Sequence, residues 1–193
     1  QIAPKGAITR HGVGRLPVDM VSSRGGHVYS LIRTDQMVWE YTPGKAPRTL
    51  KRFPDSPAGL ASDAGMLWLL TWPDGSSRNS RVARIDPTKD DFVPSKPLGE
   101  WAQAVAAGFG KVWVAHVRGG QVNVVDQKSL DVARIALPDL SLWAIVVGKD
   151  AIFAGGRIGN DNGQGIVGRI DIESLRETNR WTMNQRVQAL AVD

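Results

Sequence analysis

Cysteine is absent from the 193-residue sequence, which excludes disulfide bonds, thiolate zinc sites, iron–sulfur clusters and cysteine nucleophiles. Histidine is scarce: His11, His27 and His116 stand on separate segments, without the spacing of a metal site. No apolar run approaches the ~20 residues that a membrane-spanning helix needs, so we expect no membrane insertion. No signal-peptide pattern is visible, and because the chain starts at Gln1 we expect a processed chain or an excised piece.

Long runs of one charge are also missing. The net charge of +5 comes from 24 Lys and Arg against 19 Asp and Glu, mixed along the chain, with no run of five or six basic residues. This pattern argues against nucleic-acid binding and is compatible with an anionic partner. A serine nucleophile elbow, a Walker loop and a dinucleotide fingerprint are absent, so we expect no cofactor.

Turn-forming residues, by contrast, are abundant, with 21 Gly and 11 Pro, and they separate short segments that repeat along the chain. One small, aliphatic segment recurs five times, and its successive copies lie 40, 45, 40 and 45 residues apart. A period of about 42 residues is typical of a propeller blade. The fourth residues of the five copies are Met20, Leu60, Val105, Ile145 and Leu190.

Each repeat continues with a short turn, a β-branched and aromatic segment, a third apolar segment and a fourth, more irregular one. In three repeats the third segment ends in a hydrophobic–Asp pair, at Asp86, Asp126 and Asp171, where we expect the carboxylate to accept hydrogen bonds from the turn backbone. These patterns predict an all-β fold, a β-propeller of four-stranded antiparallel blades. Aromatic residues share one register of the second strand, at Tyr29, Trp68, Trp113 and Phe153.

Three stretches of the sequence resemble the YVTN/NHL-type, WD40-like propeller repeat: residues 110–115, 121–126 and 189–193. The likeness extends over nearly the whole chain and implies the fold. It implies function weakly, because these strand patterns are packing signals shared by sensors, scaffolds and enzymes. The first repeat departs from the pattern, since its third segment ends in Glu40-Tyr-Thr.

The repeats predict four complete blades plus part of a fifth, over residues 17–56, 57–101, 102–141 and 142–186. Residues 7–16 read as the outer strand of a preceding blade, and residues 187–193 as the inner strand of a following one. A ring of six or seven blades needs roughly 250 to 300 residues, so we expect an arc of a larger propeller. The alternative is a small closed propeller, and a second chain or copy is a further way to complete the ring.

Ligands of propellers usually contact the face formed by the loops between second and third strands and by the connections between blades, and the longer loops at 73–80 and 158–165 lie there. Arginine binds carboxylates and phosphates bidentately, and tryptophan provides a stacking surface. The alternative is that the tryptophans pack between blades and the arginines are solvated. The candidate ligand-binding residues on this face are Arg33, Trp72, Arg78, Arg81, Trp101, His116, Arg118, Arg157 and Arg186.

Catalytic and metal-binding patterns are weak. Asn160, Asp161 and Asn162 resemble a calcium loop but supply one carboxylate, and the Asn-Gly that follows is hairpin-turn chemistry. A metal-dependent propeller lactonase would need Glu, Asn and Asp at the ends of inner strands, where mainly Asp19, Asp63 and Asp193 occur. We therefore predict no catalytic residues and no metal.

The leading interpretation is a non-enzymatic binding module for a protein, peptide or anionic ligand. The family resemblance implies the extracytoplasmic sensor or scaffold part of a bacterial signalling protein. The alternatives are a fragment of a lactonase- or lyase-like propeller enzyme and a propeller arc that self-assembles.

Overall fold

The computed structural model describes residues 16–23, 26–73, 77–89, 91–159 and 163–192. Its first eight strands are β1 (Pro17–Ser22), β2 (Val28–Ile32), β3 (Met37–Tyr41), β4 (Arg48–Arg52), β5 (Ser56–Asp63), β6 (Met66–Trp72), β7 (Arg81–Ile85) and β8 (Val93–Pro94). The others are β9 (Ala102–Gly108), β10 (Lys111–His116), β11 (Gln121–Asp126), β12 (Val132–Ala136), β13 (Leu140–Val147), β14 (Ala151–Ile158), β15 (Gly165–Asp171) and β16 (Glu177–Met183). The one helical element of the described residues is the 3₁₀ turn η1 (Ser77–Asn79).

The strands form four antiparallel sheets of four, β1–β4, β5–β8, β9–β12 and β13–β16, and neighbours in sequence are neighbours in each sheet. The all-β prediction of four-stranded antiparallel blades is therefore confirmed, and we call the sheets blades 1 to 4. No helix in the described residues has the length and apolarity needed to cross a membrane.

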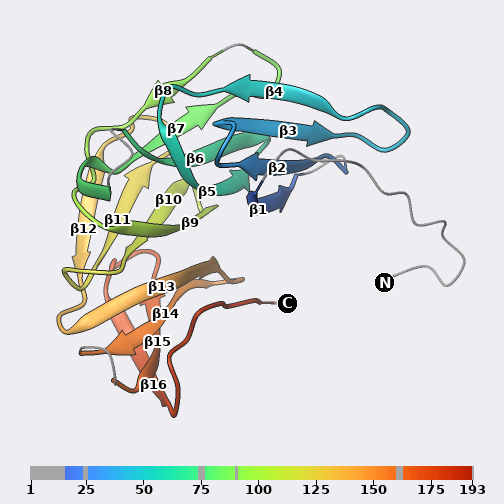
Figure 1. Cartoon of the computed structure of the whole chain (residues 1–193). Helices are drawn as coiled ribbons and strands as arrows, with labels where there is room; N and C mark the ends of the chain where they lie inside the picture. Colours follow the sequence, from blue (N-terminus) through green and yellow to red (C-terminus); the bar gives the residue numbers. More distant parts are fainter. Residues whose placement is uncertain (1–15, 24–25, 74–76, 90, 160–162, 193) are drawn as a thin grey trace, which may run out of the picture.

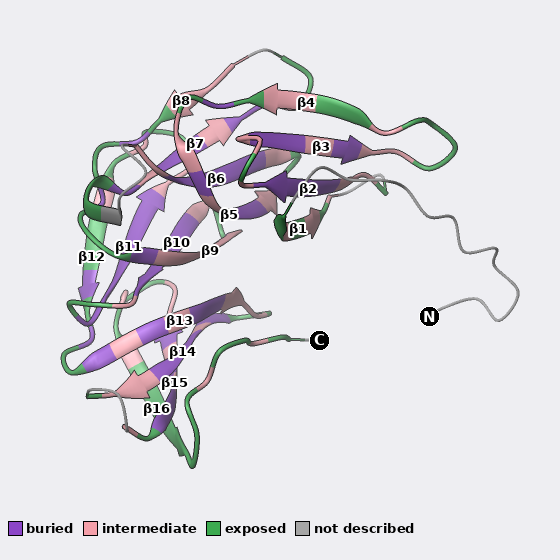
Figure 2. Cartoon of the chain, in the orientation of Figure 1, coloured by how far each residue is buried: buried purple, intermediate pink, exposed green. Residues whose placement is uncertain are grey.

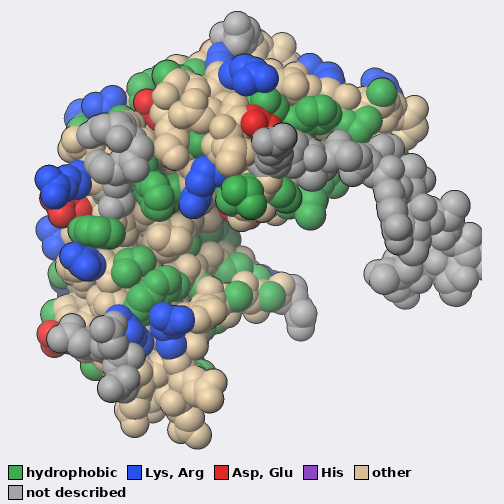
Figure 3. Space-filling model, in the orientation of Figure 1, with side chains coloured by type: hydrophobic (Ala, Val, Ile, Leu, Met, Phe, Trp, Pro, Cys, Tyr) green, Lys and Arg blue, Asp and Glu red, His purple; other side chains and the backbone are tan. Residues whose placement is uncertain are grey.

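The blades follow one another around an arc, with the first strand of each nearest the axis (Figure 1). Successive first strands are in contact, β1 with β5, β5 with β9, and β9 with β13. Blades 1 and 4 face each other across an open side, which Figure 3 shows as a hollow in the molecular surface. This arrangement brings the loops at one end of every blade onto a common face.

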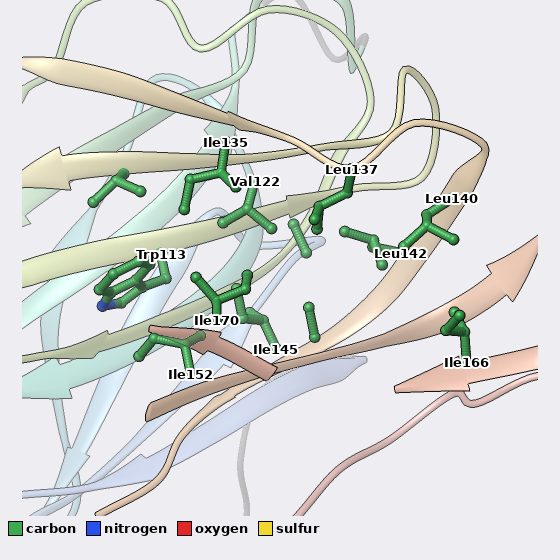
Figure 4. Close-up of a cluster of buried hydrophobic side chains, with 13 residues drawn as sticks. Trp113, Val122, Ile135, Leu137, Leu140, Leu142, Ile145, Ile152, Ile166 and Ile170 are labelled. Atoms are coloured by element: carbon green, nitrogen blue, oxygen red, sulfur yellow. The ribbon is translucent and has the colours of Figure 1, made fainter. Parts of the chain in front are cut away.

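Hydrophobic clusters fill the three junctions between blades, and the aromatic residue of each second strand lies in the cluster shared with the next blade. Tyr29, Trp68 and Trp113 belong to three different clusters, and each is 3% exposed or less. Figure 4 shows Trp113 beside Ile152 and Ile170 of blade 4. Phe153, at the same register, is only half-buried and lies 6.4 Å from the ring of Trp181. In Figure 2 burial is concentrated on the second and third strands of the blades and is lower at β1 and at the fourth strands.

The turns between third and fourth strands use the predicted aspartates. Asp86 accepts hydrogen bonds from Thr88 N (2.9 Å) and Thr88 Oγ1 (2.6 Å), and Lys89 Nζ lies 3.1 Å from its carboxylate. The hydrogen bonds from Thr88 and then the Lys89 contact lower the pKa of Asp86 to about 2. Backbone amides and serine hydroxyls lower the pKa of two others in the same way, Asp126 and Asp171.

Two strands that the sequence predicts differ from the structure: the fourth strand of the second repeat and the strand that follows the fourth repeat. The irregular fourth segment of the second repeat, which we expect over 91–98, is reduced to the two residues of β8, because Pro94 and Pro97 lack the N–H that a ladder requires. Residues 187–192 form no strand, although Val187 N donates to Gly156 O at 3.0 Å and the side chains of Val187 and Leu190 lie beside Gly155 of blade 4. The outer strand expected over 7–16 lies outside the described residues except for Leu16.

Candidate functional site: the loop face and its grooves

The loop face is defined here as the end of the blades that carries the loops between second and third strands and the connections between blades. Antiparallel strand order places both kinds of connection at the same end. Eight of the nine candidate residues occur at or beside these connections. Their positions are the end of a second strand, η1, the start of β7, and the residues before and after an inter-blade connection. The eight are Arg33, Trp72, Arg78, Arg81, Trp101, Arg118, Arg157 and Arg186.

Guanidinium groups lie over tryptophan rings at three places on this face. Arg33 Cζ is 5.2 Å from the ring centroid of Trp72, and Arg118 Cζ is 4.2 Å from that of Trp101. Such distances allow cation–π attraction. Trp143 is half-buried beneath two guanidinium groups, those of Arg157 at 4.9 Å and Arg186 at 5.2 Å.

His116, the ninth candidate, does not reach the surface. Its side chain is fully buried, and Nδ1 donates to the carbonyl of Glu100 at 2.7 Å. Burial lowers the pKa of His116 below its ordinary value, so the ring is neutral at pH 7. Nε2 is buried and has no hydrogen-bond partner among the described residues. His116 therefore supports the face from below and is not positioned to contact a ligand.

The carbonyl group that His116 binds is one of five consecutive carbonyls in the connection between blades 2 and 3, here the 98–102 connection. All five accept a hydrogen bond, three of them from side chains. The donors are Asn123 Nδ2 to Leu98 O (2.7 Å), Ser80 N to Gly99 O (3.1 Å), His116 Nδ1 to Glu100 O (2.7 Å), Val117 N to Trp101 O (2.9 Å) and Trp72 Nε1 to Ala102 O (3.1 Å).

This hydrogen bonding fixes Trp101 in an unusual conformation. Its φ of 64° lies in the left-handed region, which bulky residues rarely adopt, and 37% of its surface is exposed. Strained backbone of this kind persists only where surrounding contacts hold it, and it is concentrated at functional sites. Trp101 therefore presents its ring, with Arg118 over it, from a rigid support.

Arg118 lies in the four-residue connection between β10 and β11, which hydrogen bonds tie to neighbouring segments: Val117 N donates to Trp101 O at 2.9 Å, and Leu137 N donates to Gly120 O at 2.7 Å. Gly119 and Gly120 both have positive φ (83° and 51°), which glycine adopts at no steric cost. A Cβ at Gly120 would lie 2.3 Å from the carbonyl oxygen of Leu137, so only glycine fits.

Two grooves border this turn. The larger, of about 630 Å³, lies between blades 3 and 4 and brings Arg118 and Arg157 together with Asp139 and Ser141. The smaller, of about 300 Å³, is lined by Glu100, Trp101, Arg118, Gly119 and Gln121. Arg118 and Gly119 belong to both grooves.

The other candidates lie apart from the two grooves. Arg33 Nε donates to Pro57 O of blade 2 at 3.1 Å, so with Trp72 it joins neighbouring blades. Arg78 is exposed on η1 and Arg81 is half-buried at the start of β7, and neither lines a groove. The calcium-loop residues Asn160, Asp161 and Asn162 lie outside the described residues.

Sequence reasoning identified the arginines and Trp101 but missed Glu100, Gln121, Asp139 and Ser141, which also line the grooves. The available signals were the Gly-Gly pair and two polar residues, His116 and Asn123, inside otherwise apolar strands.

A third hollow, of about 680 Å³, lies at the opposite end of blade 1, around residues 42–47. Its lining is mostly Pro, Gly and apolar, with Lys45 as its one charged residue. Among the described residues, no three His, Cys, Asp or Glu side chains gather in a way that could hold a metal ion.

Comparison with known proteins gives structural likeness alone, since no protein-family model and no curated protein sequence matches the chain. A catalytically inactive variant of virginiamycin B lyase from Staphylococcus aureus, in a structure with quinupristin, superposes with a TM-score of 0.71 and 19% identity, over 90% of this chain and 58% of that one. Hydrazine synthase of Kuenenia stuttgartiensis superposes with a TM-score of 0.70 and 15% identity, over 92% of this chain and 53% of that one.

The chain thus spans little more than half the length of these two structures. A second structure of the lyase, substituted with selenomethionine, gives a TM-score of 0.56 at 15% identity. At such identities the likeness concerns the fold: the described part of the chain has the architecture of a β-propeller protein.

Proposed function

We propose that the chain is a non-enzymatic binding module that recognises a protein, peptide or anionic ligand on its loop face. The observation that carries the proposal is the larger groove, into which Arg118 and Arg157 converge from two different blades. Arg118 forms no ion pair with any described residue, and Trp101 supports its guanidinium face at 4.2 Å. The N–H edge of Arg118 is therefore available for an external acceptor.

Electrostatics support an oxyanion as that acceptor. Arginine presents a planar fork of donors that matches carboxylate and phosphate groups, and charge-assisted hydrogen bonds are about twice as strong as neutral ones. The net charge of +5 also favours approach of an anion.

The double variant Arg118→Ala/Arg157→Ala tests this proposal. Arg118 is exposed, where substitutions usually change stability by less than ~0.5 kcal/mol, and Arg157 is half-buried over Trp143, so thermal unfolding of the double variant is measured to show that it still folds. Arrays of peptides and anionic oligosaccharides are screened with the wild-type chain, and the molecules bound are then titrated calorimetrically into both proteins. We expect the double variant to lose binding. If every bound molecule binds the wild type and the double variant with equal affinity, the proposed binding site on the loop face is contradicted.

The cellular setting is part of the same proposal. The YVTN/NHL-like repeat resemblance supports an extracytoplasmic sensor or scaffold of a bacterial signalling protein. Locating the tagged chain by cell fractionation in its native host tests this placement.

A propeller enzyme is the second candidate. The likeness of the fold to a structure of a lyase raises this possibility, and the chain spans 58% of that protein. Incubation with quinupristin followed by mass spectrometry tests it, since a lyase would change the molecule and a pure binding module would return it intact. Metal analysis of the purified chain is the second arm, because a stoichiometric, tightly held metal would contradict the pure binding module.

A further inference from the structure

The two grooves at Arg118 form one elongated site. They share Arg118 and Gly119, so the β10–β11 turn is the ridge between a larger groove with Arg157 and a smaller one with Trp101. We infer that this joined site takes an extended acidic peptide, with a carboxylate side chain bound at Arg118. The inference rests on the proposed function and names the ligand of the same face.

Coverage of the tryptophan rings favours a peptide over a sugar. Carbohydrate sites need an open aromatic face, but Arg118 lies over Trp101, and Trp143 lies beneath two guanidinium groups. What the Arg118–Trp101 pair leaves available is the edge of the Arg118 guanidinium group, where the N–H donors point. A planar carboxylate accepts two such donors side by side.

The remaining lining of the site fits a peptide backbone. Ser141 in the larger groove can hydrogen-bond amide groups, and Gly119 leaves the turn backbone uncovered. Each groove also contains one exposed carboxylate, Glu100 in the smaller and Asp139 in the larger. Their repulsion of like charge limits a bound segment to a short acidic stretch rather than a long polyanion.

The site is also prepared before a ligand arrives. Five hydrogen bonds fix the 98–102 connection beneath Trp101, and backbone hydrogen bonds at Val117 N and Gly120 O hold the connection that carries Arg118. A ligand that finds its partners already in place loses less entropy on binding than one that must order a loop.

Calorimetric titration with two probes of equal charge tests the inference: an acetylated, amidated hexaglutamate peptide and hexagalacturonate, each with six carboxylates. We expect the peptide to bind more tightly than the sugar. Arg118→Ala should weaken peptide binding by roughly tenfold or more, as loss of a hydrogen bond to a charged group implies. Arg118→Lys keeps the charge but loses the planar fork of donors, so its affinity for the peptide should lie between those of the wild type and Arg118→Ala.

Arg176→Ala is the matched control, because Arg176 is exposed in the turn between β15 and β16 at the opposite end of blade 4. We expect its affinity to equal that of the wild type. Equal weakening in Arg176→Ala and Arg118→Ala would overturn the inference in favour of non-specific attraction. If hexagalacturonate binds more tightly than the peptide, and its binding depends on Arg118, the peptide inference is overturned but an anion site on the loop face remains. Binding of neither probe would count against both the peptide inference and the proposed function.

Discussion

At the scale of single residues, Trp101 combines three properties that rarely occur together: a left-handed backbone, an exposed ring and a main chain held by hydrogen bonds on either side. Glycine is the residue that ordinarily occupies such a φ, because an L side chain there costs roughly 1–2 kcal/mol. Trp101 is one of eight described non-glycine residues with a positive φ, and the hydrogen bonds of the 98–102 connection hold it in this conformation.

Substitution of Trp101 by two small residues separates strain from packing. Both Trp101→Ala and Trp101→Gly remove the ring, but only the glycine relieves the left-handed φ of 64°. We expect the glycine variant to have the larger free energy of unfolding, by about 1 kcal/mol, in urea denaturation. Both variants should also lose the ring that supports the guanidinium group of Arg118. A more stable alanine variant would show that the backbone at this position is not strained.

Residue-scale inference from sequence succeeded where chemistry is visible in a side chain and failed where only the fold decides. The arginines of the loop face could be placed because they flank predictable turns. His116 could not, since strand alternation does not reveal that its ring turns inward to Glu100 O. Asp139 and Ser141 could not be identified, because they line the larger groove only once blade 4 packs beside blade 3, and spacing in the sequence does not record that packing.

At the scale of elements, the aspartate turns after β7, β11 and β15 are a repeated device. Each carboxylate accepts hydrogen bonds from the amides that follow it, which the sequence predicted from the hydrophobic–Asp pairs. The departure in the first repeat is equally physical: Thr42 stands at the position of the turn aspartate, and Glu40, two residues earlier, is buried, pairs with Arg48 and lies 2.9 Å from His27 Nδ1.

The Asp86 turn makes stability depend on pH. Its folded-state pKa of about 2 lies below the ordinary value of 3.8, so its contribution to stability is fully present above about pH 4 and is lost as pH falls through 2. Asp86→Asn keeps an oxygen acceptor but cannot ionise. We expect the wild type to be more stable than this variant at pH 6 and the gap to close as pH falls toward 2, measured by urea denaturation at several pH values. A gap that stays constant with pH would exclude ionisation as its cause.

Strand boundaries show the same division between local and tertiary causes. Periodicity located most strands to within a residue or two, because alternation and turn residues are local signals. Periodicity overestimated the length of β8, where prolines interrupt the hydrogen-bond ladder. It also predicted a strand over 187–192, where Val187 is the one residue whose backbone amide hydrogen-bonds to blade 4. A β-strand forms only where a neighbouring strand is present to hydrogen-bond with it, and the pattern of one segment does not show whether that neighbour exists.

At the scale of the whole molecule, the aromatic residues at one register depend on their place in the arc. Trp113 is fully buried between blades 3 and 4, whereas Phe153 has no following blade in the described residues and is half-buried. The same contrast occurs at the inner strands, where Met20 of blade 1 is 66% exposed and Leu60 of blade 2 is 2% exposed. Position along the arc, rather than residue type, determines burial at these sites.

Substitutions at this register should report that difference. Trp113→Ala should lower the free energy of unfolding by about 3–5 kcal/mol, the usual cost of removing a large buried ring. Phe153→Ala should cost clearly less, because part of that ring already contacts solvent. Chemical denaturation of both variants measures the two values. Equal costs would indicate that Phe153 is covered in solution, by a second copy or by another chain that completes the ring.

The 98–102 connection has a consequence for how the molecule can be divided. Trp72 of blade 2 holds Ala102 O, His116 of blade 3 holds Glu100 O, and Arg157 of blade 4 closes the larger groove. No single blade, and no adjacent pair of blades, contains all of these residues. The proposed site therefore needs the three repeats of blades 2 to 4 together, and we expect that duplication or loss of a repeat at the end of blade 1 would change the length of the arc and leave the proposed site intact.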